Sequence, residues 1–520
     1  MVVRTLTISW FLSLSACTCG GSGGKDAGLD AGVFGFGGGG GAGGAGGGGA
    51  DAGTGGGTGG GAAGAVTGQR RLHRRLDGSE LIVDDPQLAG LEAFVVSSNG
   101  TFTSIAVQVV DAGFTLPGGP AEYYLKLPRL PSAPVWVVSS QRQLNLDDFN
   151  YLGRPGTPQP LGTMGVKLTV TGLDPNDAPN FALSSPNTDL YADLTAVSAG
   201  PSASLSAELF GLFRYTTGEL PAGTPGDDTW LWQTSIVDAG EGLELASVAS
   251  RGLRLTALRL EADGGTITGA FTTPLVSGTV SGNFRGADYA SLGAAVHPAS
   301  TLSFSGLDLY ISPSAPGVKD VWASYSGELA GWASYDPVDR APRFSYRDPL
   351  PASWSRFVTA TATFRTPTRL AGTTSGGVAG TVGDIWPLTQ VPAVFAPRLS
   401  PPTAVMIGTA LASGTGTLLT LQPGLRWSAP VRGTPSGYRV QVYKLVAAGT
   451  RTTRQPVLEL FTTATSMTVP PGVMTAGGTW VFAVDAVSIL DGSFAAEPFT
   501  LYTSISNSTA TAVSGMWVTP

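Results

Sequence analysis

Short runs of alternating apolar and polar residues, separated by glycine, proline, aspartate and asparagine, recur along most of this 520-residue chain. Residues 91–96 and 101–109 are two such runs, and Asn99-Gly100 stands between them. Asn-Gly between alternating runs is the strongest short-range sign of a β-hairpin. No window keeps apolar residues at the i, i+3, i+4 and i+7 positions of a helix for three turns. The chain is therefore predicted to be all-β.

The overall composition agrees with this fold class. Glycine reaches 74 residues and charged residues make up 13% of the chain, which suits a turn-rich β protein with an additional disordered segment. The formal net charge is −7, whereas a nucleic-acid-binding protein would carry a basic stripe. Nucleic acid is therefore not an expected partner.

The segment from Gly20 to about Gly64 is predicted to be a disordered linker. It is nearly all glycine and alanine, so it has too little apolar surface to offset the entropy lost on ordering. As a flexible coil of about 45 residues it would span roughly 35–40 Å. The segment contains matches to the nucleophile-elbow motif and to the dinucleotide-binding motif. These matches arise from its glycine content alone, because both motifs need a strand before them and a helix after them.

The N-terminus has the layout of an export signal. Arg4 precedes the apolar run Leu6–Leu14, which is too short to span a membrane, and Leu14-Ser15-Ala16-Cys17 follows. This layout resembles that of bacterial lipoprotein precursors. The resemblance implies that residues 1–16 are removed as a signal peptide and that Cys17 becomes the lipidated first residue, carrying fatty acids such as palmitate.

The residues around Cys17 indicate which cysteine is lipidated and to which membrane the protein is delivered. Thr18, not Asp, follows the cysteine, and in Gram-negative members of this family that implies delivery to the outer membrane. Cys19 is the competing anchor, but the residues before it fit the family pattern poorly. Cys17 and Cys19 are the only cysteines, so no disulfide or cysteine-ligated metal site is expected downstream.

A basic run, Arg70–Arg75, follows a change of composition at Val66. Two interpretations are open. The run is either a patch for anionic headgroups or surface polysaccharide, or a solvated first strand or pre-strand segment of an otherwise acidic protein, and we favour the second interpretation. His73 lies in the run without a neighbouring motif that would make it a metal ligand or a general base.

Residues 66–158 carry a loose resemblance to a known family of β-sandwiches. The stretch from Asp111 to Leu127 holds an Asp-Ala-Gly turn, an aromatic residue, a Pro-Gly turn and a Tyr-x-Leu strand. It resembles carboxypeptidase regulatory-like, transthyretin-type domains, although Ala112 interrupts the usual Asp-Gly pair and Glu122 stands where glycine is usual. The resemblance implies a non-catalytic spacer or binding module.

Residues 159–400 are predicted to be β-rich. Strand-like runs are found at 166–171, 229–234, 253–260 and 357–364. A region of this length suits a large sandwich, two packed sandwiches or a propeller. A propeller would show a repeat of roughly 40–50 residues, and no repeated dipeptide of that kind is present, so the propeller ranks second.

Residues 401–520 resemble a fibronectin type III domain, an immunoglobulin-like sandwich. The resemblance rests on the runs 425–430, 437–443, 465–470 and 478–487. Two sheets packed over one core require alternate residues to face inward. The residues predicted to do so are Leu425, Trp427, Tyr438, Val440, Val442, Met467, Val469, Trp480, Phe482, Val484 and Ala486. Trp480 stands where tyrosine is common; an indole has no hydroxyl to donate the usual corner bond, but its N–H could take that place.

Few side chains offer catalytic chemistry. His73 and His297 are the only histidines and lack local motifs, so neither a Ser-His-Asp triad nor a histidine metal site is predicted. Carboxylate pairs could supply the acid and base of glycoside hydrolysis, and each is interpreted as a solvated turn. They are Asp84-Asp85, Asp147-Asp148, Asp227-Asp228 and Glu241/Glu244.

Two further motifs have both a binding and a structural interpretation. Asp174-Pro175-Asn176-Asp177 offers hard oxygens for Ca²⁺ but lacks the spacing of a calcium loop, so an Asx turn is favoured. Trp230 and Trp232 share a strand face and could stack on sugar rings, but a core pair is the commoner arrangement. No catalytic residue, cofactor or metal ligand is therefore predicted.

These observations predict an extracytoplasmic, lipid-anchored protein of the outer membrane or cell surface. Its predicted role is binding or structural, and not catalytic. The expected parts are a signal peptide (1–16), Cys17 with its linker (17–65), a β-sandwich (66–158), a large β-rich region (159–400) and the fibronectin-like domain (401–520). Its expected partners are the membrane, through the lipid anchor, and a polysaccharide or protein ligand. The alternative is a carbohydrate-active enzyme that uses paired carboxylates in residues 159–400.

Overall fold

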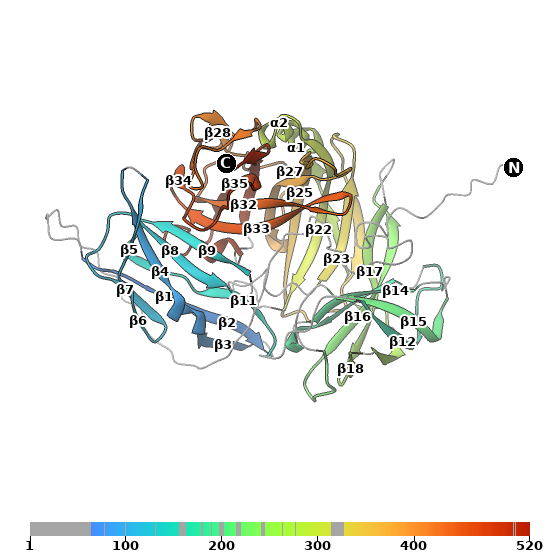
Figure 1. The fold of residues 1–520 in the computed structure, drawn as a ribbon. Coiled ribbons are helices and arrows are strands. Elements are labelled where there is room, and N and C mark those ends of the chain that lie inside the picture. Colours follow the sequence, from blue (N-terminus) through green and yellow to red (C-terminus); the bar gives the residue numbers. More distant parts are fainter. Residues whose placement is uncertain are drawn as a thin grey trace. The chain divides into compact units, whose positions relative to one another are not determined.

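A computed structural model describes residues 64–76, 79–98, 100–129, 132–154, 163–177, 180–188, 190–196, 202–214, 220–240, 245–262, 264–275, 277–313, 327–502, 504 and 506–520. Strands dominate these residues (Figure 1), which confirms the all-β prediction. Cys17, Cys19, the predicted signal peptide and nearly all of the predicted linker lie outside the described residues.

The N-terminal part contains short strands and one 3-10 helix. They are β1 (Val66–Gln69), β2 (Arg71–Leu76), β3 (Ser79–Asp84), η2 (Pro86–Gly90), β4 (Glu92–Val96), β5 (Phe102–Ile105), β6 (Gln108–Val110), β7 (Gly113–Leu116), β8 (Tyr123–Arg129), β9 (Ser132–Ser139), β10 (Gln143–Asn145) and β11 (Asp148–Leu152). Antiparallel pairing of β4 with β5 sets Val96 opposite Phe102. Gly100 in their turn has a φ of 83°, a conformation that favours glycine. The predicted hairpin is therefore confirmed.

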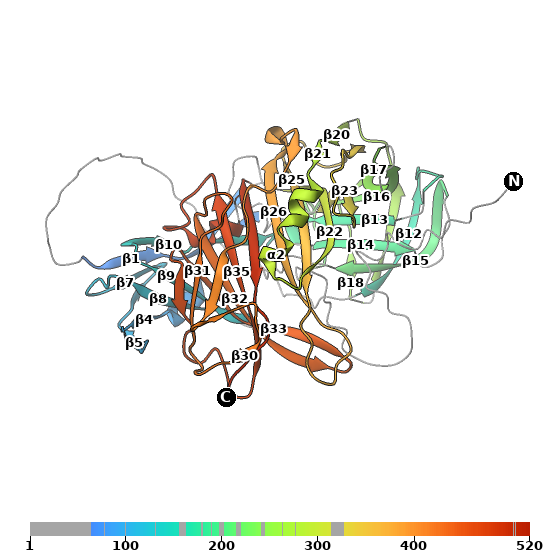
Figure 2. The ribbon, with the colours of Figure 1, turned by 90° about the horizontal axis from the view of Figure 1, so that it is seen from above.

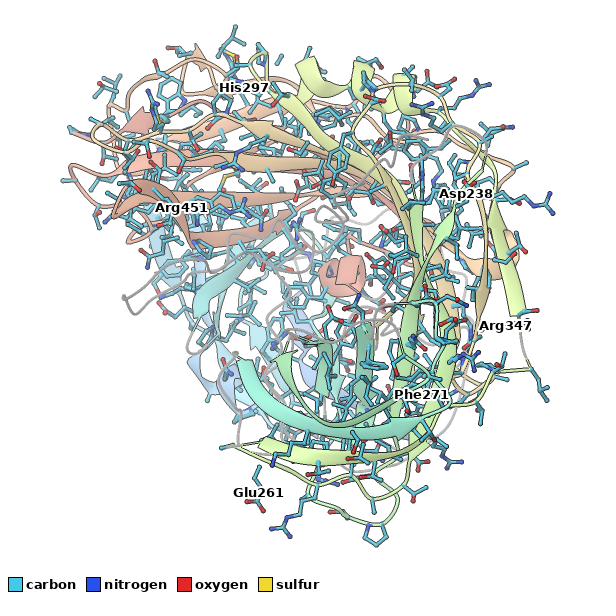
Figure 3. The ribbon with its side chains drawn as sticks, turned by 90° about the vertical axis from the view of Figure 1, so that its right-hand side faces the viewer. Asp238, Glu261, Phe271, His297, Arg347 and Arg451 are labelled. Carbon is cyan, nitrogen blue, oxygen red and sulfur yellow. The ribbon has the colours of Figure 1, made fainter. Side chains whose placement is uncertain are left out.

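A first central group of strands surrounds its own core. It comprises β12 (Thr163–Thr171), β13 (Asn180–Ser185), η3 (Pro186–Thr188), β14 (Leu190–Ala196), β15 (Ser204–Arg214), β16 (Thr229–Asp238), β17 (Leu245–Leu255), β18 (Leu260–Glu261) and β19 (Gly264–Ala270). Leu168, Leu231 and Phe271 are among the buried side chains of this core, and Phe271 is labelled in Figure 3. The predicted strand 253–260 is wrong in its second half, because β17 ends at Leu255 and a turn precedes β18.

A second central group carries the two α-helices of the described chain, and both are short. The group comprises β20 (Ser277–Ser281), β21 (Asn283–Phe284), α1 (Gly286–Ser291), α2 (Gly293–Val296), β22 (Thr301–Ser312), β23 (Gly327–Ser334), β24 (Arg343–Arg347), β25 (Ser355–Thr366), β26 (Val378–Pro387), η4 (Leu388–Gln390) and β27 (Val394–Phe395). Helix α2 lies against β26 (Figure 2), where Gly380 leaves room for the side chain of Val296.

The C-terminal part is a two-sheet sandwich. Its elements are β28 (Thr403–Ile407), β29 (Ala410–Leu411), β30 (Gly416–Thr417), β31 (Gly424–Ser428), β32 (Gly437–Ala448), β33 (Arg451–Thr462), β34 (Ser466–Thr468), β35 (Thr479–Ile489), η5 (Pro498–Tyr502), β36 (Asn507–Val513) and β37 (Trp517–Val518). One sheet has the order β29-β28-β31-β34, and the other contains β33-β32-β35-β36.

The inward face predicted for this sandwich is confirmed. Every predicted residue is at most 5% exposed, from Leu425 and Trp427 to Phe482 and Ala486. The indole N–H of Trp480 donates to Thr519 Oγ1 at 3.2 Å. Because this acceptor is a side chain 39 positions further along the chain, the bond is not the corner hydrogen bond, which runs back to the backbone a few residues upstream.

One hydrogen-bonded sheet runs through all four of these parts, and β17 of the first central group joins it by pairing with β23, which pairs in turn with β22. Pairing continues from β22 through β25, β26, β36, β35, β32, β33, β9 and β8 to β4. The pairing of β26 with β36 crosses the boundary predicted at residue 400, and a single core joins side chains from Tyr124 to Trp517. The second central group and the C-terminal sandwich therefore share both a sheet and a core.

No helix in the described residues is both long and apolar enough to cross a membrane.

Candidate functional site

Arg70 opens the basic run and is buried. It is 7% exposed, and its Nε donates to Asp85 Oδ2 at 2.5 Å. Its Nη1 donates to the backbone oxygen of Leu146 at 2.8 Å, and its Nη2 reaches Asp148 Oδ2 at 3.3 Å. Two carboxylates and a carbonyl therefore satisfy the guanidinium, which makes its burial tolerable.

The prediction of a solvated first strand is wrong for Arg70 and Arg74. Arg74 is 4% exposed, and its Nη1 donates to the backbone oxygen of Gly153 at 2.6 Å. Arg71, between them, is exposed as predicted. Along the run Arg70, Leu72 and Arg74 alternate with Arg71, so the first three are buried and Arg71 faces water.

His73 lies between two carboxylates that the sequence did not connect with it. Its Nδ1 is 2.9 Å from Glu80 Oε1, and its Nε2 is 3.1 Å from Asp147 Oδ2. Burial alone would lower the pKa of His73, but the hydrogen bonds and negative charges of Asp147 and Glu80 outweigh burial, so the pKa is raised above 6.5. The histidinium form bridges β2, β3 and the segment before β11.

The His73 bridge predicts a pH-dependent stability. Because the folded-state pKa is raised, the stabilisation is fully present below about pH 6.5 and is lost as the pH rises through the folded-state pKa. We expect His73→Gln to lower the thermal midpoint at pH 5.5 by more than at pH 8.5. His297, whose pKa is lowered by burial, provides the contrast, because His297→Gln should not weaken the protein preferentially at acid pH. Equal losses for His73→Gln at both pH values would contradict the bridge.

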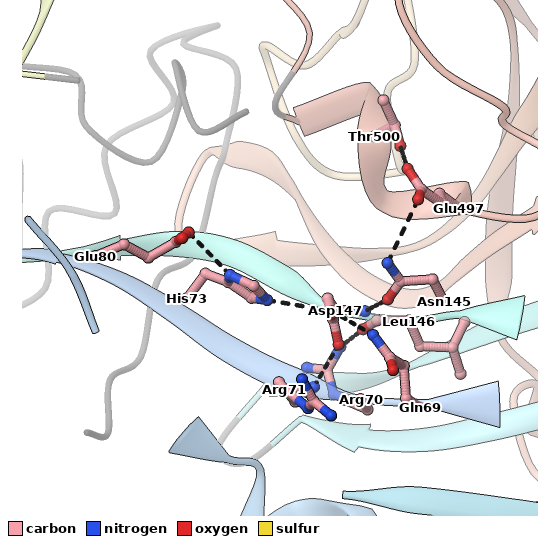
Figure 4. Close-up of polar contacts among 10 residues, drawn as sticks. All are labelled: Gln69, Arg70, Arg71, His73, Glu80, Asn145, Leu146, Asp147, Glu497 and Thr500. Carbon is pink, nitrogen blue, oxygen red and sulfur yellow. Dashed lines mark hydrogen bonds and ion pairs between the residues drawn. The ribbon is translucent and has the colours of Figure 1, made fainter. Parts of the chain in front are cut away.

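The same polar network reaches the C-terminal part (Figure 4). Asp147 N donates to Asn145 Oδ1 at 2.9 Å, and Asn145 Nδ2 donates to Glu497 Oε1 at 3.4 Å. Asn145 N also donates to the backbone oxygen of Ala496 at 2.7 Å. Hydrogen bonds therefore lead from His73 through Asp147 to the segment just before η5.

Other contacts cross the same junction. The guanidinium of Arg70 lies 5.5 Å from the ring centroid of Phe499, within cation–π range. The backbone N–H of Thr468 donates to the hydroxyl of Tyr124 at 3.1 Å. Strand β9 pairs in parallel with β33, with Trp136 opposite Leu460. Backbone, aromatic and charged groups thus connect the N-terminal and C-terminal parts.

The predicted carboxylate pairs are mostly ion-pair partners within the fold, so their interpretation as solvated turns is wrong for several members. Asp227 is 3% exposed and forms a two-pronged ion pair with Arg154. Asp228 pairs with Arg254. Asp84 is exposed, as predicted, and Glu241/Glu244 lie outside the described residues.

Two other predicted motifs take their structural interpretations. Asp174 Oδ1 accepts the backbone N–H of Asn176 at 3.0 Å, which is an Asx turn. Trp232 is fully buried in the core. Trp230 is partly buried and packs edge-on against Trp354, with ring centroids 4.9 Å apart. The core interpretation of the tryptophan pair is confirmed.

A carboxyl pair that sequence reasoning missed lies in the second central group. Asp308 on β22 and Glu328 on β23 are partly buried and share one face. A Cβ on Gly331 would collide with Glu328 Oε1 and would stand 3.0 Å from Asp308 Oδ1. The missing side chain at Gly331 therefore leaves room for both carboxyl groups.

Burial changes the acidity of this pair. It raises the pKa of Asp308 to about 7, although hydrogen bonds from Thr359 and Tyr310 act in the opposite direction. Burial, followed by the negative charges of Asp308 and Asp193, raises the pKa of Glu328 well above its ordinary value. Near neutral pH the pair therefore retains at least one proton. Its members stand 20 residues apart without a motif, so no local signal marked them.

Among the described residues, no three His, Cys, Asp or Glu side chains are arranged to hold a metal ion.

Comparison with known proteins does not assign the chain to a family. No protein-family model matches it, and no curated protein matches its sequence. Among solved structures, a candidate adhesin from Bacteroides ovatus shares 11% identity at a TM-score of 0.13, covering 45% of this chain and 84% of that chain. The FN1–FN3 domains of chicken CNTN1 share 10% identity at a TM-score of 0.14, covering 69% and 99%. TM-scores this low establish no common fold, so the functional argument rests on the chain's own residues.

Proposed function

We propose that the protein is a lipid-anchored, surface-exposed binding or structural protein of a bacterial envelope. In this proposal Cys17 is acylated, residues 17–65 form the tether, and the β-sheet parts present a ligand-binding surface to envelope polysaccharide or protein. The tether would let the folded part stand clear of the bilayer.

One observation carries the non-catalytic proposal. The carboxylates that could have served as general acid and base are already paired with arginines. Arg70 forms ion pairs with Asp85 and Asp148, and Arg154 forms an ion pair with Asp227. A carboxylate whose oxygens already accept charge-assisted hydrogen bonds from an arginine is occupied and is not free to contact a substrate. The junction between the N-terminal and C-terminal parts supports the structural side of the proposal, because paired strands hold the two parts in one sheet.

The anchor is tested by replacing Cys17. Cys17→Ala is expected to abolish incorporation of a clickable palmitate analogue and to release the protein from the membrane fraction. Cys19→Ala is the matched control and should leave both properties unchanged. Undiminished labelling of the Cys17→Ala protein would contradict the anchor assignment.

The binding role is tested with the full chain in a detergent that has no sugar headgroup. Sedimentation with purified envelope polysaccharide and capture of envelope proteins should show saturable binding. Absence of binding to either class of envelope polymer would contradict a ligand-binding role.

A second candidate function is an enzyme acting on glycans, and the proximity of Asp308 and Glu328 favours it. Two close carboxyl groups are the arrangement used in retaining glycoside hydrolysis. That reaction needs one ionised carboxylate, whereas the pKa of both groups is raised. Release of reducing ends from envelope glycans that is lost in Glu328→Gln would favour the enzyme over the binding protein.

A further inference from the structure

One end of the C-terminal sandwich consists of three segments that carry no charged side chain. They are residues 408–424, 469–478 and 514–520, in a chain of which 13% of the residues are charged. Figure 2 shows β30 and the C-terminus at this end. Backbone hydrogen bonds join the segments, from Gly408 N to Gly424 O at 2.8 Å, from Leu418 N to Val518 O at 2.8 Å and from Val469 N to Pro423 O at 3.0 Å. We call the three segments together the uncharged end.

Exposed apolar side chains gather at the uncharged end. They are Leu411, Leu419, Leu421 and Val518, which are 59%, 98%, 37% and 41% exposed. Single exposed leucines are ordinary on a protein surface, but several of them together on an uncharged surface mark an interaction site. Because apolar side chains gain free energy on leaving water, the uncharged end favours an apolar environment over water.

Basic side chains border the uncharged end. Arg426 is exposed on β31, two residues beyond the first of the three segments. Lys444 Nζ donates to Thr475 Oγ1 at 3.4 Å, which places its ammonium group beside the second segment. No aspartate or glutamate occurs between Asp384 and Glu459, although the whole chain has a formal net charge of −7. Apolar tips with a cationic border match a lipid bilayer, which offers an apolar interior beneath anionic headgroups.

We propose that the uncharged end is a membrane contact. Its four exposed apolar side chains enter the headgroup region of a bilayer, and Arg426 and Lys444 face anionic headgroups. This inference rests on the proposed lipid anchor at Cys17 and adds a second contact to it. A tether of about 45 residues spans roughly 35–40 Å, so it keeps the sandwich close to the bilayer that holds the lipid. The resulting effective concentration lets a weak contact form, because association becomes intramolecular.

The test uses the lipidated full chain in vesicles of phosphatidylcholine and phosphatidylglycerol whose acyl chains carry a spin-label quencher. An environment-sensitive fluorophore is attached to Leu419→Cys in a Cys19→Ala background, since lipid occupies the sulfur of Cys17 in the proposed mature protein. We expect blue-shifted and quenched emission. Leu275→Cys is the matched control, because Leu275 is 99% exposed but lies between β19 and β20. Its label should stay unquenched, and equal quenching at both positions would overturn the contact.

Two substitutions separate the apolar and the ionic contributions. In the protein labelled at position 419, Leu411→Asp should lower the ratio of quenched to unquenched label roughly tenfold, whereas Leu275→Asp should leave the ratio unchanged. Arg426→Gln should lower it roughly threefold to fivefold with phosphatidylglycerol present, and not with phosphatidylcholine alone. All of these positions are exposed, so the variants are expected to fold. An undiminished ratio in Leu411→Asp would overturn the contact.

The anchor and the contact can fail separately. Flotation of the protein with the vesicles reports the anchor, and quenching at position 419 reports the contact. Flotation without quenching would overturn the contact and leave the anchor standing. Quenching without stable flotation would support the contact and contradict the anchor. A blue shift that appears without lipid and grows with protein concentration would assign the uncharged end to a second copy of the chain and would overturn the proposal.

Discussion

Arg70→Met is expected to lower the free energy of unfolding by about 3–5 kcal/mol, the usual cost of removing one partner from a buried ion pair. The variant would leave Asp85, which is 4% exposed, and Asp148, which is 8% exposed, without their shared cation. It would also remove the contact of the guanidinium with Phe499. Urea denaturation should report the loss, and amide hydrogen exchange should accelerate in β2, β11 and η5.

The neighbouring arginine is the control for this prediction. Arg71→Met changes the same residue type at the next position of the chain, but the Arg71 side chain is exposed. Its effect should stay within about 0.5 kcal/mol, as for most surface substitutions. Equal stability of the two variants would show that Arg70 does not hold its carboxylates together.

Asp308→Asn is expected to stabilise the protein at pH 8. Burial raises the folded-state pKa of Asp308 to about 7, whereas the ordinary pKa of an aspartate is about 3.9. The folded protein therefore holds a proton that the unfolded chain has released, and stability falls as the pH rises from about 4 to about 7. Asparagine cannot ionise, so the variant lacks this loss. We expect a gain of about 1–3 kcal/mol at pH 8, after allowing for solvent screening of a partly exposed group.

The gain should vanish near pH 4, where both carboxyl groups of the pair are protonated in the wild-type protein. Thermal unfolding at pH 4 and pH 8 measures the difference. Asp339→Asn is the control, and its effect on stability at pH 8 should have the opposite sign. The hydrogen bond from Arg285 lowers the pKa of Asp339, so its carboxylate stabilises the folded protein at that pH. A pH-independent effect of Asp308→Asn would mean that the pair does not share a raised pKa.

Strands were predictable because their signal is local. Alternation along a run places side chains on two faces whatever the rest of the chain does, so the hairpin at Gly100 and the buried face from Leu425 to Ala486 could be derived from the sequence. The local nature of the signal also explains why the strand predicted over residues 253–260 extends too far. Leu255 and Leu260 both look like strand residues, and only tertiary pairing puts a turn between them.

Charged residues were harder to place because their partners are remote. Arg70 meets Asp148 across 78 positions, and His73 meets Asp147 across 74. A basic run has the same composition whether water or carboxylates surround it. Burial, which decides the difference, depends on how β2, β3 and β11 pair.

For this protein, the sequence by itself determined the fold class, the hairpins and the inward face of the C-terminal sandwich, because period-two alternation and turn residues act over a few positions. It also supplies the Cys17 prediction, which rests on a local motif. Only the pairing of remote strands places β4 and β22 in one sheet, buries Arg70 and brings Asp308 next to Glu328. Those features depend on strand pairing between remote segments, and remote pairing leaves no periodic trace in a single sequence.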